Sequence, residues 1–308
     1  MGSNPIGPTD SGRAGYGTLS AENPGSADDH GPAGHHLPAD NHVHSQWSHD
    51  TGPRASMAAA CARAVELGLP AVAFTEHLDF TEWGPDDAIS GTGIRPNDQW
   101  GPRPLDVDGY LWCLEECRHR FPSLRIWSGV EAGEPHLFAG SAAAVLSSGR
   151  FDRVLGSVHT LPSGGRLIYA RALLRREPPG ALMRRYFAEV VAMIEGSDLF
   201  EVLAHLDYPR RYWPEAAGRY QETDFEEEYR AVLWALASSG RVLELNTASP
   251  LVSVSLLRWW REEGGTALSF GSDAHLPGYV GERFREAASL AEAAGFRPGR
   301  DPFDFWRG

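Results

Sequence analysis

Asp40-Asn41-His42-Val43-His44 is the stretch that decides the fold of this chain. It is typical of a short β-strand, and its two histidines point to the same side because side chains alternate along a strand. A helical pattern follows at 54–67, with alanine and valine at helical spacing, and it stops at Gly68. The stretch therefore predicts the first βα unit of a domain, with both imidazoles on one side of the strand.

The same alternation of strand and helix continues along the chain. Six further β-like runs lie at 71–77, 124–131, 151–159, 200–205, 241–246 and 267–272. Further helical patterns lie at 105–121, 179–194, 224–238, 254–263 and 281–294. Seven βα units in series predict a parallel α/β barrel or sheet with right-handed crossovers, and 308 residues suffice for one such domain.

Three segments fall outside this alternation. Residues 1–38 are dense in Gly, Pro, Ser and Asp, so we expect a disordered leader before a single domain of residues 39–308. The connections 77–105 and 160–178 are long, and the first contains Trp83 and Trp100. Long loops in a compact domain usually carry function, so we expect both to form lids over a substrate pocket.

Composition and charge narrow the class of protein. Hydrophobic residues make up 42% of the chain, enough for a core, and the formal net charge is −13. This charge argues against nucleic acid as a partner, although a metal cluster can still bind a small phosphorylated substrate. The chain shows no apolar stretch of about 20 residues and no signal-peptide pattern, which predicts a cytoplasmic protein with no membrane partner. It leaves the oligomeric state open.

Histidines and acids recur where the predicted strands end. The residues concerned are His42, His44, His77, Glu131, His159, His205, Asp273 and His275, with His49 following the first strand. The carboxyl ends of parallel strands meet at one face of a barrel, where active sites lie. One such histidine would more often be an ordinary core residue, but the whole set predicts a site for Zn, Mn or Fe.

These motifs resemble a known family. His-x-His with a further His49, then Glu-His, Gly-x-Glu, Ser-x-His, His-x-Asp and Ser-Asp-x-His, is similar to the PHP (polymerase and histidinol phosphatase) superfamily. The resemblance runs from about residue 40 to about residue 275, and the segments 205–211 and 243–247 look most like its histidinol-phosphatase branch. It implies a distorted (β/α)7 barrel, in agreement with the seven units above.

The resemblance also implies three divalent metal ions. His42, His44, Glu131 and Asp273 would hold the first, and Glu131 would bridge to a second that is completed by His159 and His205. His49, His77 and His275 would hold the third; His49 is preferred to the adjacent Asp50. Asp273, Glu131 and His275 are the expected catalytic residues. The chemistry implied is in-line attack of a metal-bound hydroxide on phosphorus.

Other residues are candidates for substrate contacts. Arg210 or Arg211 could grip the phosphate with bidentate hydrogen bonds, or form a surface pair with nearby acids. Arg171 is a weaker candidate for the same task, Trp47 could stack on a flat substrate group, and Asn246 could contact substrate or water.

Three acids near the ligands have expected roles of a different kind. Glu134 is expected in the first turn of a helix, where its charge would suit the helix dipole. Strand alternation turns Glu76 away from the face where the strand ends meet. Asp207 either orients a metal ligand or pairs with Arg210.

The first hypothesis is a phosphomonoesterase that cleaves L-histidinol phosphate to L-histidinol and phosphate, a step of histidine biosynthesis. The reaction class follows from the metal constellation, while the substrate comes from the resemblance alone. Two alternatives remain at this stage. One is a phosphatase for another small ester, such as a nucleotide, sugar or secondary-metabolite phosphate, and the other is a metal-binding domain without turnover.

Overall fold

The computed structural model describes residues 37–81 and 102–308. The strands are β1 (Asp40–Val43), β2 (Ala71–Leu78), β3 (Arg125–Gly133), β4 (Arg153–Ser157), β5 (Thr160–Ser163), β6 (Arg166–Tyr169), β7 (Val202–Leu203), β8 (Val242–Asn246), β9 (Ala267–Gly271) and β10 (Trp306–Arg307). The helices are α1 (Met57–Leu67), α2 (Val107–Arg120), α3 (Ala139–Ser148), α4 (Ala170–Leu173), α5 (Pro179–Gly196), α6 (Glu226–Ser238), α7 (Val254–Glu262) and α8 (Phe284–Ala293).

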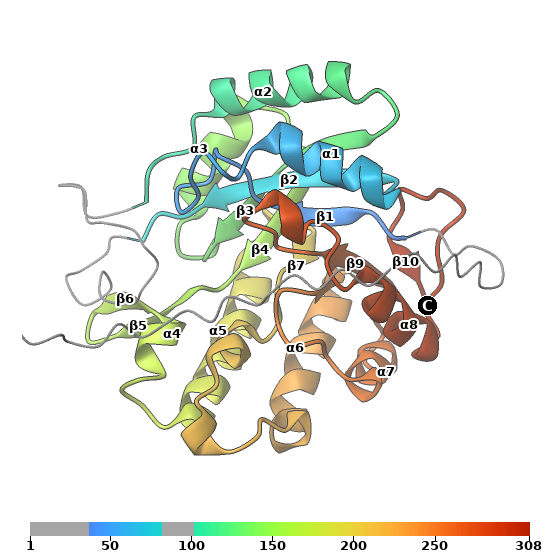
Figure 1. The fold of residues 1–308 in the computed structure, drawn as a ribbon. Coiled ribbons are helices and arrows are strands. Elements are labelled where there is room, and N and C mark those ends of the chain that lie inside the picture. The colour runs from blue at the N-terminus through green and yellow to red at the C-terminus, as the bar shows by residue number, and fades with distance from the viewer. Residues whose placement is uncertain (1–36, 82–101) are drawn as a thin grey trace, which may run out of the picture. The chain divides into compact units, whose positions relative to one another are not determined.

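One curled sheet forms the frame, with the strand order β1-β2-β3-β4-β7-β8-β9-β10 (Figure 1). The first seven strands in this order pair in parallel, and β10 pairs antiparallel with β9. Backbone hydrogen bonds from His44 N to Ala274 O (2.9 Å) and from Asp273 N to His42 O (2.7 Å) join β1 to the segment after β9. The predicted barrel of seven parallel strands is therefore confirmed, with closure near the carboxyl ends of its first and last parallel strands.

The helices lie outside the curled sheet, with α1 to α3 along one side and α5 to α8 along the other (Figure 1). Local signals explain their limits. The Ser56 hydroxyl accepts a hydrogen bond from Ala59 N at the start of α1, and Gly68 ends that helix with φ +70°. The Ser253 hydroxyl caps α7 in the same way. Tyr186, Phe187 and Trp260 bury the inner faces of α5 and α7 against the sheet.

Some segments differ from the expected pattern. Part of the long connection at 160–178 forms a hairpin, β5 and β6, followed by the short helix α4. The alanine-rich helix α3 begins at Ala139, five residues after Glu134, where a helix was expected to start. Residues 1–36 and 82–101 lie outside the described residues, and with them most of the expected leader and both Trp83 and Trp100.

The chain returns to the amino end of the sheet after α8. Phe303 packs against a cluster of Ala39, Ala71, Ala73 and Trp127, and Phe305 packs against a second cluster of Leu155, Val202, Ala204, Val242 and Ala267. Trp306 is buried in β10 against Phe270. The C-terminal segment thus covers the amino ends of the strands.

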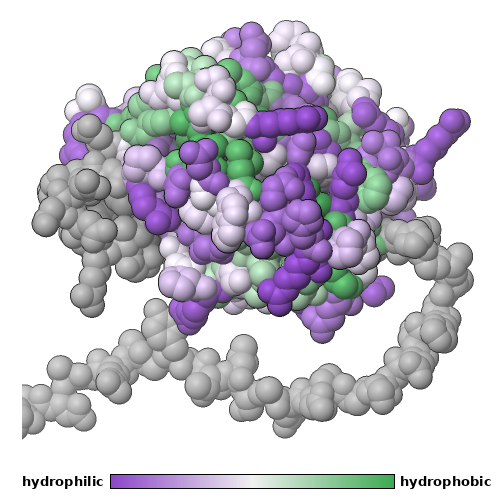
Figure 2. Space-filling view, turned by 90° about the horizontal axis from the view of Figure 1, so that it is seen from above, coloured by the Kyte–Doolittle hydropathy of each residue, from purple (hydrophilic) through white to green (hydrophobic). Residues whose placement is uncertain are grey.

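The surface seen from above Figure 1 mixes hydrophilic residues with smaller hydrophobic areas (Figure 2). None of the described helices combines the length and apolarity that a membrane span needs.

Candidate metal centre

Four side chains from three strand ends converge on one point. His42 and His44 extend from β1, and their Nε2 atoms lie 3.1 Å apart. Glu131 of β3 brings Oε2 to 3.3 Å from His42 Nε2, and Asp273, just after β9, brings Oδ1 to 3.3 Å from His44 Nε2. Ligand atoms about 2.0–2.1 Å from one tetrahedral ion lie about 3.3 Å from each other, so these spacings suit a shared cation.

A second donor group uses the other oxygen of the same carboxylate. Glu131 Oε1 lies 3.3 Å from His159 Nε2 and 2.6 Å from His205 Nε2, and the two ring nitrogens are 3.3 Å apart. His159 follows β4 and His205 follows β7. Glu131 therefore belongs to both donor groups, with one oxygen in each.

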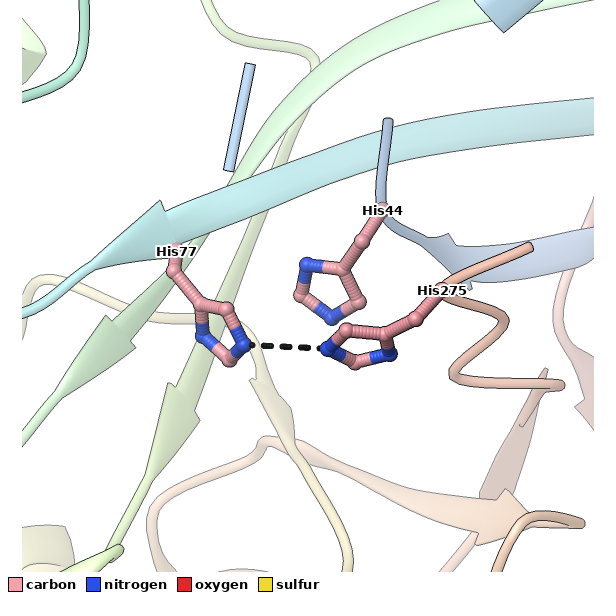
Figure 3. Close-up of side chains that lie close together, drawn as sticks. All are labelled: His44, His77 and His275. Atoms are coloured by element: carbon pink, nitrogen blue, oxygen red, sulfur yellow. Dashed lines mark hydrogen bonds between the residues drawn. The ribbon is translucent and has the colours of Figure 1, made fainter. Parts of the chain in front are cut away.

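A third donor group lies beside the first. His77 Nε2 is 3.4 Å from His275 Nε2, and both face the side on which His44 lies (Figure 3). Asp50 completes this group, with Oδ2 3.1 Å from His275 Nε2 and 3.4 Å from His77 Nε2. His49, which was expected here, instead places Nε2 2.7 Å from Asp79 Oδ2. The loop after β1 turns the carboxylate of Asp50 toward His77 and His275, while His49 lies with Asp79 on the other side of His77.

Partners on the outer ring nitrogens fix which nitrogen faces inward. His42 Nδ1 donates to Glu244 Oε1 at 2.6 Å, and His275 Nδ1 donates to the backbone oxygen of Asp273 at 3.0 Å. The Ser48 hydroxyl donates to Glu76 Oε2 at 2.6 Å, so it accepts from His44 Nδ1 at 3.0 Å. In all three rings Nδ1 meets a partner outside the centre and Nε2 faces inward, as in carboxylate–histidine–metal arrangements.

The donor set fits divalent metal ions. The inward nitrogens of His42 and His44 lie beside two buried carboxylates, a cluster of donor atoms whose negative charge a divalent cation would offset. Glu131 Oε2 is buried and has no hydrogen-bond donor among the described residues. Imidazole and carboxylate ligands suit Zn, Mn or Fe.

Burial and mutual charge set the protonation of the donors. Burial, together with the charges of His77 and His275, holds the pKa of His44 well below its usual value, which favours the neutral form that binds metals. Burial alone would raise the pKa of Glu131, but the imidazoles of His42, His159 and His77 hold it well below its usual value. The bridge between the first two groups is therefore an ionised carboxylate.

Backbone conformation at the site is unusual. Glu134, His205 and Asp273 have positive φ angles of 44°, 21° and 52°, three of the four such non-glycine residues in the described part of the chain. Side chains other than glycine adopt this region at a cost, and such strain concentrates at functional sites. The sharp turns after β3, β7 and β9 aim these side chains across the carboxyl end of the sheet.

Comparison with known proteins identifies the family. The model of the PHP domain matches residues 40–248, more than half of the chain. The chain belongs to the PHP domain family. The match stops before Asp273 and His275, which the fold brings back beside β1.

Curated relatives of this PHP protein are named as phosphatases. The histidinol-phosphatase of Lactococcus lactis subsp. lactis is 25% identical over 266 residues, which cover 82% of this chain and 90% of the relative. A protein of Deinococcus radiodurans named probable histidinol-phosphatase is 28% identical, and the match covers 81% of this chain and 90% of the relative. A crystal structure of the L. lactis histidinol phosphate phosphatase with zinc, L-histidinol and phosphate shares the fold, with a TM-score of 0.72 and 24% identity over 87% of this chain and 98% of that one.

The two predicted arginines beside the PHP site differ in their contacts. Arg211 donates from Nη2 to Asp273 Oδ2 at 2.5 Å and to Asn246 Oδ1 at 3.0 Å, so it reaches the donor groups. Arg210 pairs instead with Asp207 and Glu222, at 3.1 and 2.9 Å. Asp207 therefore takes the second of its two expected roles, and Arg210 belongs to the packing of the 3-10 helix η2 (Tyr208–Tyr212).

Asn246 lies among the donors and their supports. Its Nδ2 donates to Glu244 Oε2 at 3.0 Å, and its Oδ1 accepts from the backbone nitrogens of Ala248 and Ser249 as well as from Arg211. Asn246 therefore orders the loop after β8 and holds the guanidinium that contacts Asp273.

Arg171 follows the hairpin β5–β6 in α4, and its guanidinium lies 5.4 Å from the centre of the Tyr169 ring. Its Nε is buried without a hydrogen-bond partner among the described residues. Burial and Tyr212 raise the pKa of Tyr208 well above its usual value, while the nearby charges of Arg211 and Arg171 oppose that rise. The Tyr208 ring itself lies 5.1 Å from the His205 ring and 5.2 Å from the His159 ring. The Arg211 guanidinium lies 5.3 Å from the centre of the Tyr208 ring and so on the side of the second donor group.

Two single residues have contacts that the sequence did not indicate. Trp47, a candidate for stacking on substrate, has its ring against Gly109 of α2, where an added Cβ would come within 2.5 Å of the indole. Glu134 was expected in the first turn of a helix, but α3 begins only at Ala139. Glu134 is buried, and its Oε1 accepts from the backbone nitrogens of His159 and Thr160 at 2.6 and 2.7 Å.

Other residues of the site were found only in the structure. Glu244 contacts His42, and its Oε2 also accepts from His205 N at 2.7 Å. Asp79 contacts His49, His77 and His159. Strand alternation could have identified both, because residues two apart on a strand face the same side. Glu244 precedes Asn246 by two residues, and Asp79 follows His77 by two. Glu76 supports His44 through Ser48 from the side that alternation predicted.

Proposed function

We propose that this PHP protein is a metal-dependent histidinol-phosphatase that hydrolyses L-histidinol phosphate to L-histidinol and phosphate. The observation that carries the proposal is the convergence of three donor groups on Glu131 and His44, which no single structural role requires. The two relatives described above, whose matches cover four fifths of this chain, support the choice of substrate.

Three divalent ions, zinc or else manganese or iron, are proposed. The first would be held by His42, His44, Glu131 and Asp273, the second by Glu131, His159 and His205, and the third by Asp50, His77 and His275. Such ions supply Lewis acidity toward phosphate oxygens and lower the pKa of an attacking water.

The chain's own residues would orient the reacting groups. Asp273 directs Oδ1 toward His44 while Arg211 and Asn246 hold Oδ2, so this carboxylate has one orientation. Its Oδ1 is placed to accept a hydrogen bond from the attacking water. Arg171, with its unpartnered Nε, would donate to a phosphate oxygen and offset part of the ester's negative charge.

Exposure indicates the side from which a substrate would reach the donors. The His275 side chain is 36% exposed and that of Asp50 is 25% exposed, whereas those of His42, His44 and Glu131 are at most 1% exposed. The third donor group is therefore the part of the candidate metal centre that is open to solvent. A phosphate ester that approached there would meet His275 first, with Glu131 at the closed end.

The test is release of inorganic phosphate by protein loaded with Zn²⁺ or Mn²⁺. L-Histidinol phosphate is compared with a panel of nucleoside and sugar monophosphates, and chelator-treated protein serves as the control. We expect kcat/KM for histidinol phosphate to exceed that for every other ester by at least about tenfold, a difference of about 1.4 kcal/mol in transition-state binding. Preference for another ester would overturn the substrate, and metal-loaded protein without any turnover would overturn the enzyme.

A further inference from the structure

Asp79 is a buried carboxylate at the edge of the metal centre that coordinates none of the three proposed ions. It lies one residue beyond the end of β2, and its side chain is 6% exposed. Oδ2 is 2.7 Å from His49 Nε2 and 3.6 Å from His77 Nδ1, while Oδ1 is 3.4 Å from His159 Nδ1. One side chain therefore meets three imidazoles from three segments.

Those imidazoles belong to different donor groups. His159 offers Nε2 to the second group, and Asp79 lies on its opposite nitrogen. His77 offers Nε2 to the third group, and its Nδ1 lies between Asp79 Oδ2, at 3.6 Å, and Glu131 Oε2, at 3.1 Å. His49 precedes Asp50, so its bond to Asp79 holds the backbone of the loop that carries the third carboxylate. The first group, with His42 and His44, depends on Glu244, Ser48 and Glu76 instead.

Gly133 shows that space is kept for this carboxylate. A Cβ added to Gly133 would lie 2.0 Å from Asp79 Oδ1 and 3.5 Å from His159 Nδ1. Any other residue at the end of β3 would therefore displace the Asp79 oxygen from the His159 ring. Because Gly133 leaves room for both side chains, Asp79 and His159 pack against each other, although the hydrogen bond between them is long.

We infer that Asp79 is a positioning residue that couples the second and third metal positions and leaves the first independent. The inference rests on the proposed three-metal centre but not on the identity of the substrate. An aspartate can accept bonds on both oxygens, whereas an asparagine offers one acceptor and one donor. In Asp79→Asn, therefore, one acceptor cannot serve both histidines: the His159 ring can rotate away from the second ion, or the loop that joins His49 to Asp50 can move away from the third.

The experiment measures metal affinity directly. Purified protein is loaded with Zn²⁺ and titrated with a chelator, and the bound metal is counted by mass spectrometry. For Asp79→Asn we expect two ions to be released at free Zn²⁺ concentrations about 10- to 100-fold higher than in the parent protein, with one ion unchanged. Titration with Co²⁺ gives a second readout, because the visible absorption of the retained ion should match that of the parent's tightest site.

Three variants separate positioning from general destabilisation. Gly133→Ala keeps the Asp79 side chain but moves its oxygen, so it should weaken the same two ions. Glu244→Gln should weaken a different set that includes the His42 ion. Asp152→Asn is the matched control, because Asp152 accepts from Ser128 and Arg118 without touching any proposed ligand, and all affinities should be retained.

Each remaining outcome is decisive. Equal weakening of all ions in Asp79→Asn, or unchanged affinities in both Asp79→Asn and Gly133→Ala, would overturn the coupling. A lower unfolding temperature of metal-free Asp79→Asn with parental affinities would also overturn it, because that result assigns Asp79 to packing alone. Selective loss of two ions in a protein that does not hydrolyse histidinol phosphate would leave the inference standing and remove only the proposed function.

Discussion

The two ends of the same sheet use opposite chemistry. At the carboxyl end, His42, Glu131 and Asp273 bury polar groups that face one another. At the amino end, small and apolar residues such as Ala71 and Val202 are covered by Phe303 and Phe305 from the C-terminal segment. One end gathers groups whose burial costs free energy, and the other gathers apolar groups whose burial lowers it.

Backbone strain follows the same division. His205 and Asp273 hold positive φ angles directly after their strands, and Glu134 does so just beyond β3. Strain of this kind persists only where the rest of the fold outweighs it, which the covered amino end and the packed helices can do. The comparison predicts that substitutions at the carboxyl end change activity and metal affinity, whereas substitutions at the amino end change stability.

The largest expected effect is that of Asp273→Asn. Asparagine suits the positive φ of this position, so the fold should be retained. Its single acceptor oxygen cannot serve both the first ion and Arg211, which now share the two carboxylate oxygens. We expect kcat for histidinol phosphate to fall by about 10³-fold or more, with an unchanged circular dichroism spectrum. Unaltered turnover would refute the place of Asp273 in the centre.

Glu244→Gln is expected to have the next largest effect. Glu244 accepts bonds from His42 Nδ1, His205 N and Asn246 Nδ2, at 2.6, 2.7 and 3.0 Å. A glutamine oxygen can keep the bond to His42 or the bond to His205, and its NH₂ then faces the other donor. Affinity for the ion at His42 should fall about 10- to 100-fold, measured by chelator competition. Parental affinity would show that the fold alone orients His42.

The positions of most proposed ligands were predictable from local rules. Period-two alternation placed His42 and His44 on one side of β1, and the meeting of parallel strand ends brought Glu131 and His159 to the same face. The choice between His49 and Asp50 was not predictable in this way. Both follow β1 in an irregular loop, where His49 contacts Asp79 and Asp50 contacts His77 and His275.

Tertiary contacts account for the other differences. Glu134 is an acidic residue at a position that suits the start of a helix. The turn after β3 instead gives it a positive φ and directs its carboxylate to the backbone of His159. Trp47 carries a large flat ring of the kind that stacks on ligands. Only the close approach of α2 at Gly109 shows where that ring lies. Phe303 and Phe305 cover the amino end through contacts between residues far apart in the chain. The periodicity of the sequence cannot predict such contacts.

Phe305→Ala tests the amino end of the comparison. Phe305 is half-buried against Leu155, Val202 and their neighbours, and the Arg153 guanidinium lies 4.9 Å from its ring centre. Truncation should lower the free energy of unfolding by about 2 kcal/mol, less than for a fully buried phenylalanine. Urea unfolding measures this loss, and the folded fraction should retain parental kcat and metal content. A fall in kcat at full metal occupancy would break the division between the two ends.

Arg171→Ala is expected to have the smallest effect, because its proposed role is a contact with substrate and not with the ions. A hydrogen bond to a charged group is worth about 1.5–3 kcal/mol, and solvent that replaces the guanidinium recovers part of it. We therefore expect kcat/KM for histidinol phosphate to fall by about tenfold, mostly through KM, while metal affinity stays parental. Arg210→Ala is the matched control, because Arg210 is held by Asp207 and Glu222 and should leave KM unchanged. If Arg210→Ala raised KM and Arg171→Ala did not, the phosphate contact would belong to η2, and the hairpin β5–β6 would have no direct part in binding the ester.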